Sequence, residues 1–165
     1  MSFSQKKISV DEAIIKARTF CNYRDRCHKE VKDKLYGLGL WKNEVDQVLI
    51  QMMNEDLLNE ERYARSFVRG YFRTKRWGKI KIRYELQSKQ IHSRLIQTAL
   101  KEINEDEYQQ TIEYLIQKKL GLLKGEKLMN KKQKVVNYLM QKGYQFGDFK
   151  NELSAPKRNI SIRRF

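Results

Sequence analysis

A spacing of apolar residues recurs three times along the chain and constrains the fold more than any other feature of the sequence. Its anchors are Leu35, Leu86 and Leu139, which lie about 50 residues apart. Apolar residues also stand four positions before each anchor and five, ten and fourteen positions after it. Because repeats of this length bury their apolar faces against one another, the chain is predicted to be a tandem helical array. The recurring residues are Val31, Leu40, Val45 and Leu49; Ile82, Ile91, Ile96 and Leu100; and Val135, Tyr144, Phe149 and Leu153.

Each copy has the pattern of three helices. The four-residue step before the anchor keeps two apolar side chains on one helical face. A turn follows at Gly39, Gln90 and Gly143, and a second short helix buries the last two apolar positions. The predicted fold is all-α, with about nine helices in three tandem three-helix repeats that form an elongated, curved array. The helix that precedes each pair is predicted over residues 10–23, 60–73 and 106–120.

One local pattern disagrees with this fold. Ile80, Ile82, Tyr84 and Leu86 alternate with polar residues, which is typical of a strand. The equivalent residues of the other two copies carry the four-residue step of a helix instead. Since the three copies share the remaining pattern, we predict a helix here.

The repeats also predict where the chain divides. Asp11, Asn59 and Asn104 have side chains suited to N-caps and stand at or just before the start of the first helix of each copy. Pro156, the only proline, lies in a basic C-terminal segment. The predicted parts are a frayed N-terminus at 1–8, three-helix repeats at 9–56, 57–103 and 104–153, and a basic tail at 154–165.

The middle of the chain carries a dense run of positive charge. The formal net charge is +15, and between Arg62 and Ile91 the only acid is Glu85. Like charges this close repel one another, so the run indicates an anionic partner. On a helix, five arginines of the run fall at steps of three and four and form one stripe, here called the arginine stripe: Arg62, Arg65, Arg69, Arg73 and Arg76. The candidate nucleic-acid or filament-binding residues are these five with Lys75, Lys79, Lys81, Arg83 and Lys89.

The alternative without a binding role is an ordinary solvent-exposed helix face. Such a face usually mixes acidic and basic residues, which pair with one another, so the scarcity of acids disfavours it. Trp77, beside Arg76, fits either base stacking or ordinary packing at an interhelix turn. A secondary basic patch, equally compatible with a solvated loop, comprises Lys118, Lys119, Lys124, Lys127, Lys131 and Lys132, with Lys134 close by.

No pattern of catalysis, metal binding or membrane insertion is visible. Cys21, Cys27, His28 and His92 match no zinc spacing, and the sequence has no phosphate-binding glycine loop or nucleophile motif. No apolar run approaches the roughly 18 residues of a membrane span. The sequence therefore predicts a cytoplasmic protein that is not an enzyme and that holds no metal or cofactor.

The chain resembles the RecX family of recombination regulators over about Ala13 to Leu153. The likeness rests on the order and spacing of a whole set of residues, and it departs from the family where the acidic pair before Tyr63 reads Asn59-Glu60-Glu61. The set comprises Arg24, Arg26, Glu30, Val31, Lys34, Leu35, Gly39, Leu57, Leu58, Glu61, Tyr63, Ala64, Phe67, Val68, Gly78, Arg83, Leu86, Lys89 and Ile91.

This resemblance implies a regulatory protein without a catalytic centre. Such proteins bind the RecA recombinase filament on DNA, lie in its groove, and limit its ATPase, growth and strand exchange in homologous recombination, DNA repair and the SOS response. The implied partners are a RecA-type filament and single- and double-stranded DNA, bound weakly, nonspecifically and in a salt-dependent manner. We expect a monomer with no membrane partner. The alternative is a nonspecific DNA-binding helical-repeat module that acts without a recombinase.

Overall fold

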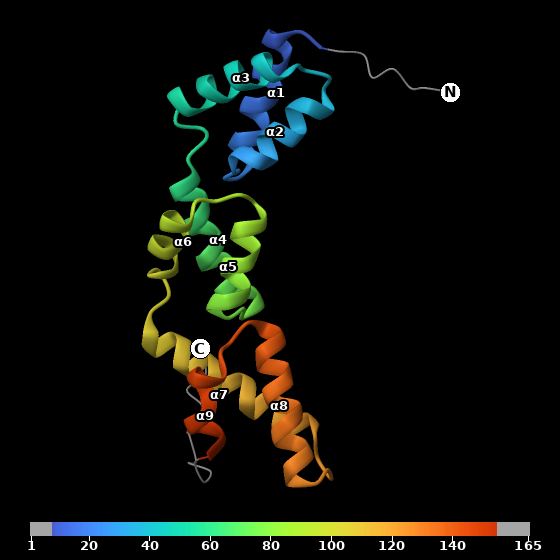
Figure 1. The fold of residues 1–165 in the computed structure, drawn as a ribbon, viewed down its shortest axis with the longest axis vertical. Coiled ribbons are helices and arrows are strands. Elements are labelled where there is room, and N and C mark those ends of the chain that lie inside the picture. Colours follow the sequence, from blue (N-terminus) through green and yellow to red (C-terminus); the bar gives the residue numbers. More distant parts are fainter. Residues whose placement is uncertain (1–7, 155–165) are drawn as a thin grey trace, which may run out of the picture. The chain divides into compact units, whose positions relative to one another are not determined.

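The computed structural model describes residues 8–154, and every regular element in that part of the chain is an α-helix (Figure 1). The all-α repeat fold is therefore confirmed. The proposed repeat boundaries stay predictions, and the basic tail lies almost entirely outside the described residues. The helices are α1 (Val10–Tyr23), α2 (His28–Gly37), α3 (Lys42–Asn54), α4 (Glu60–Lys75), α5 (Lys79–Ser88), α6 (Ser93–Leu100), α7 (Glu105–Leu122), α8 (Leu128–Lys142) and α9 (Phe146–Ser154).

The apolar spacing of the sequence forms the buried face of these helices. The anchors Leu35, Leu86 and Leu139 are fully buried, as are the three residues four positions before them. Of the five recurring positions in the three copies, Leu153 is the one that is only half-buried. The repeat thus describes the core, because each of its positions places an apolar side chain against neighbouring helices.

The three predicted turns share one backbone conformation. Gly39, Gln90 and Gly143 have φ angles of +85°, +62° and +92°, in the left-handed region that ends many helices. Glycine takes this conformation at no steric cost, whereas Gln90 takes it with a Cβ atom. The turn in the middle copy is therefore set by its position in the repeat and not by glycine.

The segment with strand-like alternation is helix α5, as predicted. Ile82 and Leu86, four residues apart, are fully buried, while Ile80 and Tyr84 are 42% and 70% exposed. Only the four-residue step faces the core, so the alternation has no structural counterpart.

The helix starts follow from capping chemistry. Ser9, and not the predicted Asp11, caps α1, because its Oγ accepts a hydrogen bond from the Glu12 N–H at 3.2 Å. The predicted caps Asn59 and Asn104 are confirmed: Asn59 Oδ1 accepts from the Arg62 N–H at 2.9 Å, and Asn104 Oδ1 accepts from the first turn of α7.

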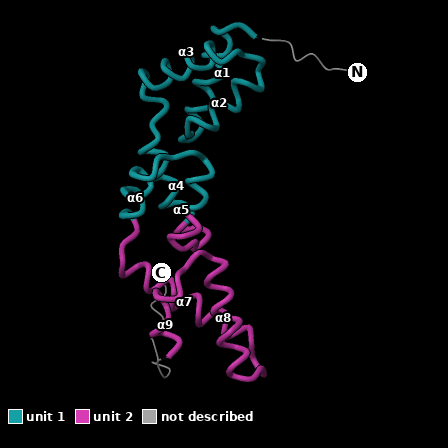
Figure 2. Tube along the Cα trace, in the orientation of Figure 1, with its two compact units in different colours: residues 1–71, 83–102 teal, residues 72–82, 103–165 magenta. Residues whose placement is uncertain are grey.

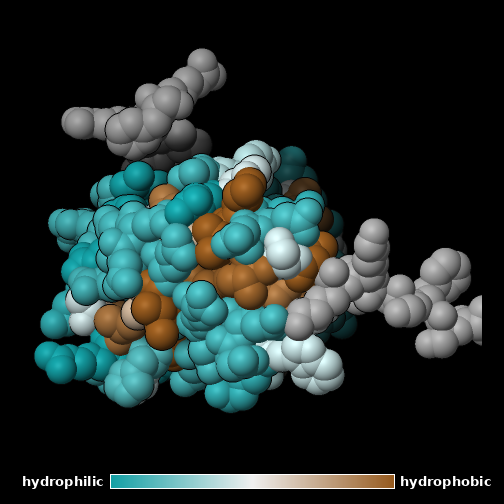
Figure 3. All heavy atoms as spheres, turned by 90° about the horizontal axis from the view of Figure 1, so that it is seen from above, coloured by the Kyte–Doolittle hydropathy of each residue, from teal (hydrophilic) through white to brown (hydrophobic). Residues whose placement is uncertain are grey.

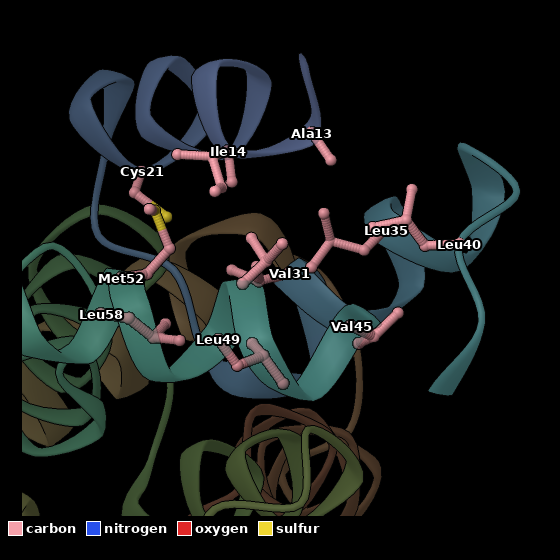
Figure 4. Close-up of a cluster of buried hydrophobic side chains, with 12 residues drawn as sticks. Ala13, Ile14, Cys21, Val31, Leu35, Leu40, Val45, Leu49, Met52 and Leu58 are labelled. Atoms are coloured by element: carbon pink, nitrogen blue, oxygen red, sulfur yellow. The ribbon is translucent and has the colours of Figure 1, made fainter. Parts of the chain in front are cut away.

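The chain forms two compact units (Figure 2). Unit 1 comprises Met1–Tyr71 and Arg83–Glu102, and unit 2 comprises Phe72–Ile82 and Ile103–Phe165. In unit 1, α1, α2 and α3 pack on one another around an apolar cluster in which side chains from all three helices point inward (Figure 4). Figure 3 shows apolar side chains gathered on the face of the molecule that is seen from above. In unit 1, Ile15 of α1 and Ile50 of α3 are exposed.

Three aromatic rings pack together in the core of unit 2. Helices α7, α8 and α9 pack on one another, and Tyr108 of α7 lies 5.1 Å from Tyr144 and 6.1 Å from Phe72, centroid to centroid. The Tyr108 hydroxyl also donates to Asp148 at 3.1 Å. This core holds the end of α4 and the start of α5 against the last three helices.

Candidate functional site

The arginine stripe is shorter than predicted. Arg62, Arg65 and Arg69 lie on the part of α4 that belongs to unit 1, with Tyr63 and Phe67 buried on the opposite face. Arg73 lies on the part of α4 in unit 2. Arg76 is not on this helix: α4 ends at Lys75, and Arg76 has a φ of +51°. The stripe predicted to include Arg76 is wrong at that residue because the helix ends first.

Carboxylates from distant parts of unit 1 pair with the three arginines of its stripe. Arg62 Nε lies 2.9 Å from Asp25, and its Nη1 lies 3.1 Å from Asp56. Arg69 lies 3.1 Å from Glu102, which also contacts Arg65. The hydrogen bonds from Arg65 and Arg69 hold the pKa of Glu102 below its usual range. The positive run thus has acidic partners that lie far away in the sequence.

A shallow depression of about 240 Å³ lies beside this paired part of the stripe. Glu61, one of its lining residues, pairs with Arg65 at 2.9 Å. Since carboxylates already engage the arginines, the depression offers an anion little uncompensated charge. Its lining comprises Asn59, Glu61, Arg62, Arg65 and Arg69.

Two lysines of the predicted set are also paired. Lys79 Nζ lies 2.6 Å from Glu105, within unit 2, and Lys89 Nζ lies 3.2 Å from Glu30, within unit 1. Burial alone would raise the pKa of Glu30, but the hydrogen bond and charge of Lys89 hold it below the usual value. Five members of the predicted set form no ion pair with any carboxylate of the described residues: Arg73, Lys75, Arg76, Lys81 and Arg83.

The corner between α4 and α5 is locked onto the turn between α8 and α9. The Gly78 N–H donates to the Lys142 carbonyl at 2.8 Å, and the Ile80 N–H donates to the Gly143 carbonyl at 3.0 Å. Carbonyls at the end of α8 thereby satisfy N–H groups at the start of α5. The backbones approach so closely because both Gly78 and Gly143 lack a side chain.

Two side chains fix the corner from the other direction. Lys142 Nζ donates to the Lys75 carbonyl at 2.9 Å, and the Tyr144 hydroxyl donates to the Arg76 carbonyl at 3.0 Å. Tyr144 is almost fully buried. The residues that carry the positive charge of this corner are therefore held in place through their own backbone.

Five cations gather at this corner of unit 2 and are here called the corner cluster: Lys75, Arg76, Lys81, Lys118 and Lys142. Burial lowers the pKa of Lys142, and the positive charges of the other four lower it further. No ion pair joins any of the five to a carboxylate of the described residues. An anion placed among these cations would be attracted by several of them at once.

Aromatic rings lie among these cations. The Arg76 guanidinium lies 4.6 Å from the centroid of the Tyr114 ring, and Lys81 Nζ lies 4.8 Å from that of Trp77. Tyr114 is 46% exposed. Exposed rings interleaved with cations are typical of surfaces that bind single-stranded nucleic acid.

The secondary patch divides in the structure. Lys118 joins the corner cluster, whereas Lys119 lies over the Tyr138 ring, 5.3 Å from its centroid. Lys134, near this patch, pairs with Glu126 at 2.8 Å. Four other members lie in the connection between α7 and α8 or at the start of α8: Lys124, Lys127, Lys131 and Lys132.

Lys142 is the member of the corner cluster that sequence reasoning missed. It stands alone at the end of α8, outside both predicted patches. The only local signal was its place just before the turn at Gly143, and that says nothing of the four cations around it.

The described residues form neither a metal-binding cluster nor a disulfide. Within residues 8–154 there is no group of three His, Cys, Asp or Glu side chains placed to hold a metal ion. Both cysteines are free and buried, and burial raises the pKa of each thiol. Among the described helices none has the length and apolar character needed to cross a membrane.

Comparison with known proteins gives one consistent family. The family model described as "RecX, second three-helix domain" matches residues 59–100, and "RecX, third three-helix domain" matches residues 105–150. The proteins named Regulatory protein RecX from Oceanobacillus iheyensis and Prosthecochloris aestuarii are 26% and 28% identical over 89% and 81% of this chain. The chain spans 54% of the first relative and 85% of the second.

Solved structures agree on the fold. The crystal structure of RecX from Lactobacillus salivarius superposes with a TM-score of 0.80 and 24% identity, and the match covers 88% of this chain and 96% of that one. A second crystal structure of a regulatory protein RecX has a TM-score of 0.76 at 22% identity. At these identities the likeness concerns the fold. With both three-helix domain models and the named relatives in agreement, the chain belongs to the RecX family.

Proposed function

We propose that this chain binds the filament of a RecA-type recombinase on DNA and inhibits its ATP hydrolysis, growth and strand exchange. The observation that carries the proposal is the match of two successive three-helix domains to a family of regulatory proteins. In this proposal the protein acts in the cytoplasm as a monomer, through contacts alone, without a catalytic centre or cofactor.

The charge of the chain supports a partner that contains nucleic acid. A nucleoprotein filament presents protein surface and phosphate together, and phosphate attracts uncompensated cations. The net charge of +15 strengthens long-range attraction to such a filament, while the unpaired cations supply close contacts. Two other predicted residues, Arg73 of unit 2 and Arg83 of unit 1, are exposed cations without an ion pair to a described carboxylate.

The alternative is a nonspecific DNA-binding module that needs no recombinase. The corner cluster favours it, because phosphate binding by these residues requires no protein partner. The two functions differ in their effect on the recombinase. A regulator changes the activity of the recombinase at amounts that leave most of the DNA uncovered, whereas a DNA-binding module does not.

The test is a pull-down of preformed recombinase filaments, followed by a strand-exchange assay. We expect the chain to sediment with filaments more than with the same DNA alone, and to inhibit strand exchange at substoichiometric amounts relative to the recombinase. Equal binding to filaments and to bare DNA, with no inhibition of strand exchange at equimolar protein, would refute the filament regulator. It would support the nonspecific DNA-binding module.

A further inference from the structure

We propose that the corner cluster is the site at which this protein binds the phosphate backbone of a nucleic acid strand. The site combines residues from both predicted basic regions with Lys142, which neither contained. The inference deepens the proposed function by locating its DNA contact, and it rests on that function for the identity of the strand as DNA. Its test uses bare nucleic acid, so it can fail while the filament proposal stands.

Hydrogen bonds to the backbone hold part of the corner cluster in place before any ligand binds. Lys142 Nζ and the Tyr144 hydroxyl bond to the carbonyls of Lys75 and Arg76, and the Gly78 N–H bonds to the Lys142 carbonyl. Four helices, α4, α5, α7 and α8, contribute cations to the cluster, and Arg76 adds one from the corner between α4 and α5. The hydrogen bonds fix the backbone of this corner against the end of α8. A site of this kind loses less conformational entropy on binding than mobile surface lysines do.

The cations of the corner cluster form no ion pair with a carboxylate of the described residues. Lys75 and Lys118 are exposed, while Arg76, Lys81 and Lys142 are half-buried. Lys142 is close enough to the other four cations for their charges to lower its pKa. A phosphate group among them would replace repulsion with attraction and favour the charged form of Lys142.

An exposed aromatic ring lies beside two cations of the corner cluster. Tyr114 presents an exposed ring beside Arg76 and Lys118, with the Lys118 Nζ 5.9 Å from its centroid. Stacking of a base on an aromatic ring contributes about 1–3 kcal/mol and is independent of base identity. The site therefore favours a single strand, whose bases are accessible, over a duplex.

The paired arginines of the arginine stripe differ from the corner cluster in their charge compensation. Arg62, Arg65 and Arg69 are each engaged by one or more carboxylates, so a phosphate must displace an internal partner before it can bind them. Cations without such partners bind phosphate without that cost. The paired arginines Arg62, Arg65 and Arg69 are therefore weaker candidates for a phosphate site than the corner cluster.

The test is fluorescence anisotropy of the full chain with a labelled single-stranded oligonucleotide of 20 nucleotides, at several salt concentrations. The triple variant Lys75→Gln, Lys81→Gln and Lys118→Gln removes three charges but keeps the three aliphatic stems. We expect its affinity at 50 mM salt to fall at least about tenfold. The slope of log affinity against log salt should fall by about 2, since each single-strand phosphate contact contributes roughly 0.7.

The matched control changes three exposed lysines outside both predicted patches, Lys16→Gln, Lys101→Gln and Lys150→Gln, with the same loss of net charge. We expect the control to keep most of the affinity and slope. Equal losses in both triple variants would show that net charge alone drives binding and would overturn the site.

Four further measurements complete the test. Thermal melting checks that the corner variant is folded, and the single variant Lys142→Arg, which keeps the charge, should bind within about threefold of the wild type. The corresponding duplex should bind more weakly than the single strand. ATP competing as well as the oligonucleotide at equal phosphate concentration would identify a nucleotide site and contradict the proposal.

Discussion

At the scale of single residues, Gly78 and Gly143 decide whether the corner between α4 and α5 can form. A Cβ atom on Gly78 would lie 2.2 Å from the Gly143 carbonyl oxygen and 2.6 Å from the Tyr144 nitrogen. A Cβ atom on Gly143 would lie 2.3 Å from the Lys81 Cβ, on a backbone with a φ of +92°. The obstacles at Gly78 are backbone atoms, so no side-chain rotation relieves the clash.

We expect Gly78→Ala to lower the free energy of unfolding by about 1–3 kcal/mol or more, because the backbones must separate and lose two hydrogen bonds. Urea denaturation measures it. The control is Gly121→Ala in α7 of the same unit, where an added Cβ atom meets nothing within 4 Å. That change should be neutral or stabilising by up to about 1 kcal/mol. Equal effects of the two variants would refute the close approach.

A second residue-scale prediction concerns acid stability. Arg18 donates two hydrogen bonds to Glu55, at 2.6 and 2.7 Å, and the pair holds the pKa of Glu55 at about 2 instead of 4.5. A lowered carboxyl pKa stabilises the folded state above the ordinary value, and this contribution is lost as the pH falls from 4.5 towards 2.

We therefore expect Glu55→Gln to be less stable than the wild type above about pH 5, with the difference vanishing towards pH 2. Denaturation curves between pH 2 and pH 6 give the comparison. A difference that stays constant over this range would mean that the ion pair is not formed.

At the scale of elements, α5 shows why one segment can mislead while the repeat does not. Its alternating apolar residues predict a strand when read alone, yet Val31 and Leu35, and Val135 and Leu139, carry the helical step at the same place. Comparison of three copies shows which apolar positions recur and which occur in one copy alone. The helices and turns were therefore predictable from the sequence.

The helix makes a specific prediction for two isoleucines. Ile82→Ala removes a fully buried side chain and should cost about 2–5 kcal/mol of folding free energy, whereas Ile80→Ala, at a position 42% exposed, should cost under about 1 kcal/mol. Both are measured by denaturant unfolding. A strand buried on that alternating face would make both substitutions costly, so similar losses would contradict helix α5.

The ion pairs of α4 mark the limit of sequence reasoning for this element. Asp25 and Arg62 are 37 residues apart, as are Arg65 and Glu102. A window of sequence shows the arginines without these acids, and so predicts an unpaired stripe. Only packing of the helices within unit 1 brings the acids to it.

At the scale of the whole molecule, the same limit applies to the candidate site. The two basic regions were both found in the sequence, but nothing in the chain order predicts that Lys75, Arg76 and Lys81 lie near Lys118. The meeting point depends on the two glycine contacts of unit 2 and on Lys142. The sequence predicts both basic regions. It does not predict that their side chains lie close together, because that depends on the tertiary fold.

The predicted basic residues fall into two groups according to whether a carboxylate pairs with them. Cations engaged by carboxylates contribute to the fold, and cations without such partners contribute to the partner surface. Substitutions in the first group should therefore lower stability before they alter binding, whereas those in the second should alter binding at unchanged stability.

The most direct test of this account is the DNA-dependent ATP hydrolysis of the cognate RecA-type recombinase, with this protein titrated in at two salt concentrations. Three proteins are compared: the wild type, the corner variant (Lys75→Gln, Lys81→Gln and Lys118→Gln) and the control variant (Lys16→Gln, Lys101→Gln and Lys150→Gln). The account predicts inhibition by the wild type and the control, and at least about tenfold more protein for equal inhibition by the corner variant, with a gap that narrows at higher salt. No inhibition by the wild type at equimolar protein, together with tight binding to bare DNA, would contradict the account.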